Sequence, residues 1–198
     1  MHRYIKAFRK HGLGEKYGAV LVSYADDFVV LCRRDAGQVL EVTRQWMNRI
    51  GLSLNEDKTR LKDARCEKFD FLGYTFGPLY SPRTGGRYNG AMPSKKAVTR
   101  LKESIRQQLR PSNMMPIDEV VKRLNRTVRG WANYFDYGTV TTVRHHMDRF
   151  VYEKVRHFLR RRHKVQGRGI RKFPDKWVFG ELGVVSLRRL PRSANASV

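Results

Sequence analysis

Cysteine and acidic residues are scarce in this 198-residue chain, and long apolar runs are missing. The two cysteines, Cys32 and Cys66, form no CxxC pair and have no histidine nearby at ligand spacing, which argues against both a disulfide scaffold and a zinc site. No segment reaches the run of about 18 apolar residues that a membrane span needs. The N-terminus, MHRYIKAFRKHG, lacks the apolar centre of a signal peptide. We therefore expect a cytoplasmic protein without a membrane partner.

The scarcity of acids leaves a large excess of positive charge. Lys and Arg number 41 against 18 Asp and Glu, so the formal net charge is +23. Such an excess favours a polyanionic partner. Hydrophobic residues make up 40% of the chain and aromatic residues 11%, which is enough apolar material to fold and excludes a disordered basic tail.

The charge is distributed unevenly along the chain. Residues 1–92 contain 16 Lys and Arg against 10 Asp and Glu, and residues 93–198 contain 25 against 8. The net charges are therefore +6 and +17. This asymmetry predicts two units with different tasks, joined near residues 85–93.

The first half has the pattern of an α+β domain with an antiparallel sheet. Residues 19–24 and 28–32 are β-branched apolar runs that flank a turn, which predicts a hairpin of buried strands. Apolar residues at helical spacing predict a helix over 36–50. Further strands are expected at 52–55 and 68–76, followed by a hairpin around Gly85 and Gly86.

After Pro93 the apolar period changes from 2 to 3.6, which predicts three helices. Ser94 is a candidate N-cap for the first helix, whose inner face carries Leu101 and Ile105. The second helix is expected over about 116–135 and the third over about 143–162. The second half of the chain is therefore predicted to form a small three-helix unit followed by a basic, glycine-rich stretch.

Two adjacent carboxylates, Asp26 and Asp27, stand at the turn of the first predicted hairpin. Magnesium is bound by few protein carboxylates together with phosphate oxygens of the substrate, so this pair indicates metal-assisted phosphoryl transfer. The alternative is that the aspartates only favour the turn.

Several segments in a fixed order resemble the reverse transcriptases of the group II intron type. YADDFVVL, GLSLNEDKTR and FDFLGYTF resemble the second half of the palm, and PSKK with LNRTVRGWANYFDYG resembles the maturase-specific domain X, or thumb. The resemblance covers roughly residues 15–165.

The resemblance implies roles for individual palm residues. Asp26 and Asp27 would bind the catalytic magnesium, and Lys58 would protonate the pyrophosphate leaving group. The residues implied near the primer or nucleotide are Tyr24, Ala25, Phe71, Leu72 and Gly73. For Lys58 the alternative is a solvated surface charge, and for Phe71 and Leu72 it is a place in the core.

The sequence departs from the family upstream of YADD. Only about 23 residues precede Tyr24, and Glu15 is their only acid. The earlier palm strand with its metal-binding aspartate is not found, so we expect an incomplete two-metal magnesium site and little or no polymerisation unless an N-terminal half is supplied in trans. Unpaired strand edges left by such a gap would favour self-association.

The thumb region has basic stripes suited to phosphate backbones. The candidate nucleic-acid-binding residues are Lys95, Lys96, Arg100, Arg126, Arg129, Arg156, Arg160, Arg161, Arg162, Lys164, Arg168, Arg171 and Lys172. Trp131, Tyr134 and Phe135 are either stacking residues for unpaired bases or, at helical spacing, core residues.

The predicted organisation is a partial reverse-transcriptase palm at 1–92, domain X at 93–165 and a basic tail at 166–198 that resembles the start of a DNA-binding region. The predicted function is that of a group II intron reverse transcriptase and maturase, with RNA binding as the main capability of this chain. Expected partners are group II intron RNA, a DNA target and an RNA/DNA primer-template. The alternatives are a basic RNA- or DNA-binding protein without catalysis and an inactive remnant of a mobile element.

Overall fold

The computed structural model describes residues 2–81 and 83–192, and it divides the chain into two compact units. Unit 1 is Met1–Glu67 and unit 2 is Lys68–Val198. No helix of the described residues combines the length and the apolar character that crossing a membrane requires. The charge asymmetry and the change of apolar period predict a boundary at residue 92, whereas the two compact units are divided 25 residues earlier, between Glu67 and Lys68.

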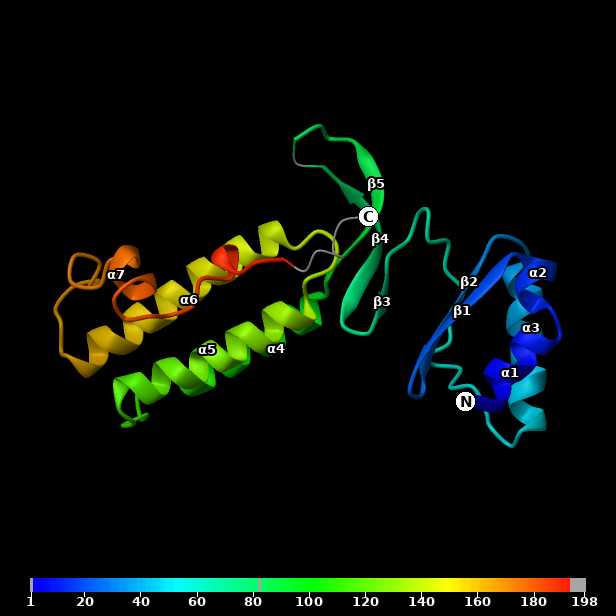
Figure 1. Ribbon diagram of the computed structural model, residues 1–198, viewed down its shortest axis with the longest axis horizontal. Coiled ribbons are helices and arrows are strands. Elements are labelled where there is room, and N and C mark those ends of the chain that lie inside the picture. Colours follow the sequence, from blue (N-terminus) through cyan, green and yellow to red (C-terminus); the bar gives the residue numbers. More distant parts are fainter. Residues whose placement is uncertain (1, 82, 193–198) are drawn as a thin grey trace. The chain divides into compact units, whose positions relative to one another are not determined.

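Unit 1 is a two-stranded antiparallel sheet with helices packed on one face (Figure 1). Its elements are α1 (His2–Lys10), α2 (Leu13–Tyr17), β1 (Ala19–Tyr24), β2 (Asp27–Cys32) and α3 (Ala36–Arg49). The hairpin and α3 confirm the prediction. The sequence analysis did not predict α1 and α2, although Tyr4 and Phe8, four residues apart, form the buried face of α1.

The hairpin of unit 1 is buried on one face only. Val20, Val22 and Leu31 point to the other face and are 59%, 41% and 46% exposed. The predicted hairpin of buried strands is therefore buried on one face and exposed on the other. Burial alternates along β1 because both faces of this strand carry apolar side chains and only one has helices against it.

The predicted strand at residues 52–55 is absent. Leu54 packs against the core of unit 1, but Leu52 is exposed, and the segment pairs with no strand of the described residues. The Leu52 N–H instead donates to the Met47 carbonyl and closes the end of α3.

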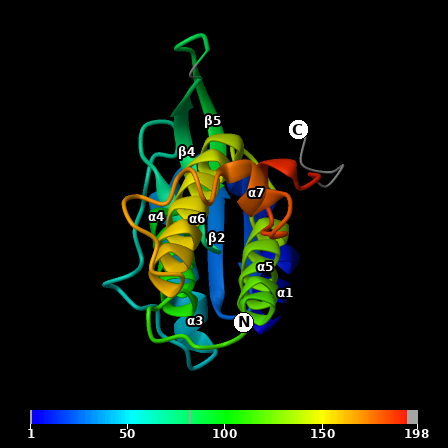
Figure 2. The same ribbon diagram turned by 90° about the vertical axis from the view of Figure 1, so that its left-hand side faces the viewer.

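Unit 2 begins with a three-stranded antiparallel sheet in the order β3-β4-β5 and continues into helices (Figures 1 and 2). Its elements are β3 (Phe69–Phe71), β4 (Tyr74–Tyr80), β5 (Arg87–Pro93), α4 (Lys95–Gln108), α5 (Ile117–Tyr134), α6 (Thr141–Arg162), α7 (Asp175–Phe179) and a 3-10 turn, η1 (Leu187–Arg189). The predicted hairpin around Gly85 is confirmed as β4 and β5. The single strand predicted at 68–76 is in fact two strands, because Leu72 and Gly73 both have positive φ and form a tight turn.

Helices α4, α5 and α6 group into one bundle, as Figure 2 shows, and confirm the three-helix prediction. Leu101 and Ile105 of α4, Leu124 of α5 and Met147 of α6 are almost completely buried in the core. Ser94 caps α4 by accepting a 3.1 Å hydrogen bond from the Ala97 N–H.

The segment after α6 is part of this core. Phe173, Val178, Val184 and Leu187 are buried against the bundle, so residues 166–190 do not form a separate basic tail as predicted.

Candidate functional site

The two adjacent carboxylates lie at the tip of the β1–β2 hairpin. Tyr24 pairs with Asp27, which leaves Ala25 and Asp26 as the two-residue turn. Ala25 has a φ of 51°, a left-handed conformation that costs a residue with a side chain about 1–2 kcal/mol. Tyr24 is 67% exposed, and both aspartates are exposed. The tip therefore presents two carboxylates and an aromatic ring to the solvent.

The donor set of this tip fits a magnesium ion held jointly with a substrate. Magnesium is bound through one or two carboxylates, and the remaining positions are filled by water and phosphate oxygens. Asp26 and Asp27 supply two carboxylates on adjacent residues. No group of three or more His, Cys, Asp or Glu side chains is assembled among the described residues.

Lys58 lies on an exposed turn of unit 1. Its N–H donates to the carbonyl and to the side-chain oxygen of Asn55, at 3.0 and 3.2 Å. The turn is tied to α3 by a two-pronged contact in which Arg44 donates to Glu56 at 3.0 and 2.8 Å. Hydrogen bonding from Arg44 lowers the pKa of the Glu56 carboxyl. The structure thus places Lys58 in the same unit as Asp26 and Asp27.

Of the residues implied near the primer or nucleotide, Phe71, Leu72 and Gly73 belong to unit 2. Leu72 and Gly73 form the β3–β4 turn, and Phe71 ends β3. The Tyr134 hydroxyl donates to the Leu72 carbonyl at 2.9 Å, and the Ser94 N–H donates to the Gly73 carbonyl at 2.8 Å. These bonds attach the turn to the end of α5 and to the start of α4.

The RGWANYFDYG segment joins the sheet of unit 2 to its helices. The Trp131 and Phe135 rings lie 4.8 Å apart, and Phe135 is buried, which supports a core role for it. The Tyr74 hydroxyl donates to the Tyr134 carbonyl at 2.8 Å. Burial raises the pKa of this hydroxyl above its ordinary value. Tyr134 and Tyr137 are 57% and 48% exposed, so these two rings of the segment are open to a base.

Three of the predicted RNA-binding arginines are engaged by the fold. Arg156 is only 7% exposed and donates to the Arg168 carbonyl at 2.6 Å, so it is removed from the interface. Arg160 and Arg162 donate to the carbonyls of Gly167 and Met115, at 2.9 and 2.6 Å. The other predicted residues are all exposed: Lys95, Lys96, Arg100, Arg126, Arg129, Arg161, Lys164, Arg168, Arg171 and Lys172.

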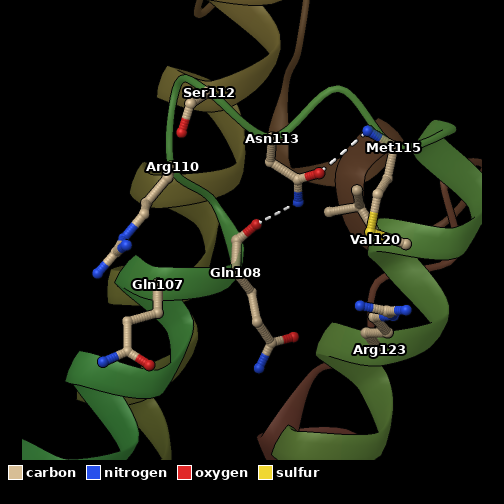
Figure 3. Close-up of a pocket in the computed structure, with 8 residues that line it drawn as sticks. All are labelled: Gln107, Gln108, Arg110, Ser112, Asn113, Met115, Val120 and Arg123. Carbon is tan, nitrogen blue, oxygen red and sulfur yellow. Dashed lines mark hydrogen bonds between the residues drawn. The ribbon is translucent and has the colours of Figure 1, made fainter.

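A shallow cleft opens beside the α4–α5 turn (Figure 3). Its volume is about 280 Å³. Its lining residues are Gln107, Gln108, Arg110, Ser112, Asn113, Met115, Val120 and Arg123. Asn113 donates to the Gln108 carbonyl at 2.7 Å and accepts from the Met115 N–H at 3.0 Å, which fixes the turn. Arg110 and Arg123 lie on opposite sides of Gln108 and make the cleft electropositive.

The sequence analysis missed two cations of the bundle, Lys102 and Lys154. Both lie near the Phe150 ring, together with Arg106. Lys102 and Arg106 on α4 are four residues apart, and so are Phe150 and Lys154 on α6. The sequence shows these two spacings, but it does not show that α4 and α6 pack together.

Comparison with known protein families agrees with both halves of this description. The model of the family described as reverse transcriptase (RNA-dependent DNA polymerase) matches residues 1–76, and the model of the group II intron, maturase-specific domain matches residues 98–177. No curated protein matches the chain. With the carboxylate hairpin in the first match and the helical bundle in the second, the chain belongs to the group II intron reverse transcriptases and maturases.

Proposed function

We propose that this chain binds group II intron RNA through unit 2, and that the hairpin of unit 1 contributes Asp26 and Asp27 to the metal site of RNA-directed DNA synthesis. The observation that carries the first part is the charge of unit 2. Lys68–Val198 contains 28 Lys and Arg against 9 Asp and Glu, a net charge of +19.

Burial removes two acids, Asp136 and Asp148, and two arginines, Arg144 and Arg156, from the surface of unit 2, so the net positive charge of the surface is undiminished. Asp136 and Asp148 are buried, and each is paired inside the fold, with Arg144 at 2.7 Å and with Arg188 at 3.0 Å. The exposed cations therefore face the solvent with few exposed carboxylates among them. A polyanion such as RNA is the partner that this surface fits.

The second part of the proposal rests on the hairpin tip. When bound, magnesium stabilises the charge on the attacking and leaving oxygens of an in-line displacement. Asp26 and Asp27 would hold it, and the exposed Tyr24 would lie beside the nucleotide. Lys58 would act as the general acid that protonates the departing pyrophosphate.

RNA binding is tested by fluorescence anisotropy with a labelled intron RNA at several salt concentrations. We expect affinity to fall linearly on a log–log plot, because each neutralised phosphate contributes about 0.7–0.9 to the slope. Six or more contacts would lower affinity by about a thousandfold between roughly 50 and 200 mM salt. Weak binding that is independent of salt would contradict the proposal.

The metal site is tested by primer extension on an RNA template in magnesium and in manganese. The variant is Asp26→Asn with Asp27→Asn, and the matched control is Asp57→Asn, another exposed aspartate of unit 1. Extension that the double substitution abolishes and the control retains supports the site. Extension that both variants retain would remove Asp26 and Asp27 from the chemistry.

The basic nucleic-acid-binding protein without catalysis is the second candidate, and the charge of unit 2 favours it equally. It predicts RNA binding with no extension, and no line broadening of Asp26 and Asp27 signals when manganese is added. Broadening confined to the hairpin tip would favour the polymerase site instead.

A further inference from the structure

Three cations converge on one phenyl ring in unit 2. The Lys102 and Lys154 ammonium groups lie 5.4 and 5.5 Å from the centre of the Phe150 ring, and the Arg106 guanidinium lies 5.2 Å from it. Lys102 and Arg106 come from α4, whereas Phe150 and Lys154 come from α6. The cluster therefore bridges two helices that are neighbours in the bundle.

The three positive charges lie close together, and the cluster itself contains no carboxylate to neutralise them. One cation over an exposed ring gains about 0.5–1 kcal/mol, but three cations around one ring repel each other. Glu153, which precedes Lys154, is paired with Arg149 at 3.2 Å. A bound anion would relieve the repulsion.

The cluster lies on a continuous basic strip. On α4, Lys95, Lys102 and Arg106 recur at spacings of seven and four residues, which places them on one helical face, and Arg110 follows just after the end of the helix. Four residues of helix rise about 6 Å, so successive cations follow each other at short intervals. Arg110 extends this row of cations to the cleft of Figure 3, which it lines.

The environment of α6 is electropositive beside the cluster. Desolvation lowers the pKa of His157, and the charges of Arg156, Lys154, Arg160 and Arg161 lower it further. His157 follows Lys154 by three residues and so lies on the same side of the helix. The part of this shift that comes from the neighbouring cations, as distinct from the desolvation, marks a surface that favours an anion.

We propose that Lys102, Arg106 and Lys154, arranged around Phe150, form a phosphate-binding site that holds the sugar-phosphate backbone of RNA across α4 and α6. The proposal rests on RNA binding by unit 2 and assigns it to this face. The ligand is a phosphate and not a stacked base, because the three cations already surround the ring that a base would need.

The test compares two triple variants with the same change in net charge, from +23 to +20. The first variant replaces Lys102, Arg106 and Lys154 with Gln. The control replaces Arg83, Arg87 and Lys176 with Gln, three exposed cations of unit 2 outside the strip. Because both lose three charges, the long-range field weakens equally and only local contacts differ.

We expect the first variant to reduce the salt slope by about 2–3 and to weaken RNA binding about 50- to 150-fold near 0.15 M salt, since three phosphate contacts are lost. The control should weaken binding less than about threefold. Equal losses in the two variants would overturn the site, because they would show that only net charge matters. Unchanged binding in the first variant would overturn it as well.

A second measurement uses the wild-type chain and is independent of how the variants fold. The Phe150 ring signals are followed by NMR while a short RNA oligonucleotide or polyglutamate is added. Shifts with RNA that inorganic pyrophosphate reverses support a phosphate site. RNA binding without ring shifts would overturn the site and leave the proposed function standing, whereas absence of RNA binding would refute the proposed function itself. Shifts with polyglutamate alone would assign the surface to an acidic protein and overturn the proposal.

Discussion

Asp148 is expected to be the residue on which the attachment of the C-terminal segment depends. Its carboxylate is 2% exposed and accepts from the Ser186 hydroxyl at 2.7 Å, from the N–H groups of Leu187 and Arg188 at 2.6 and 3.2 Å, and from the Arg188 guanidinium at 3.0 Å. In Asp148→Ala the Ser186 and Leu187 donors stay buried without an acceptor. Each such donor costs about 1–3 kcal/mol, so the expected loss of unfolding free energy is about 2–6 kcal/mol.

The assay is urea unfolding followed by tryptophan fluorescence, with limited proteolysis as a second readout. Trp131 and Trp177 report on unit 2, whereas Trp46 belongs to unit 1 and serves as an internal reference. We expect cleavage between α6 and η1 to accelerate in Asp148→Ala. The matched control, Asp118→Asn, changes an exposed aspartate at the start of α5 and should cost less than about 1 kcal/mol. A loss below about 1 kcal/mol in Asp148→Ala would refute this account of the segment.

Three further outcomes are expected. Leu124→Ala should lower the unfolding free energy by about 2–5 kcal/mol, because Leu124 is completely buried, and a urea-unfolding change below about 0.5 kcal/mol would contradict its core position. Gly138→Ala should lower the unfolding free energy by about 1–3 kcal/mol or more, because Gly138 has a φ of 74° and a Cβ there would collide with the Ala91 carbonyl. Thermal melts measure this loss. The control is Gly130→Ala, which has open space around its Cβ and should leave the melting temperature unchanged or raise it. The pKa of His157, followed by NMR, should lie below its ordinary value in the free chain and rise when RNA binds. Since the unfolded state then binds the proton more tightly, the contribution of His157 to stability should be lost as the pH falls from the ordinary pKa through the lowered one.

The sequence by itself determined the features that depend on local chemistry. The β-branched apolar runs on either side of Asp26 and Asp27 specify a hairpin with both carboxylates at its tip, and Ser94 specifies the start of α4. Helical periodicity placed Leu124 on the buried face of α5. The charge imbalance between the two halves indicated the polyanionic partner, because composition requires no knowledge of the fold.

Only the tertiary structure decided which polar groups the fold itself uses. Arg156 belongs to the same basic helix as the exposed Arg161, yet it is buried and donates to the Arg168 carbonyl. Asp148 meets Leu187 across 39 residues, and Lys102 meets Phe150 across two helices. Local spacing describes one element at a time, whereas these contacts arise when the bundle closes and brings distant side chains to the same place.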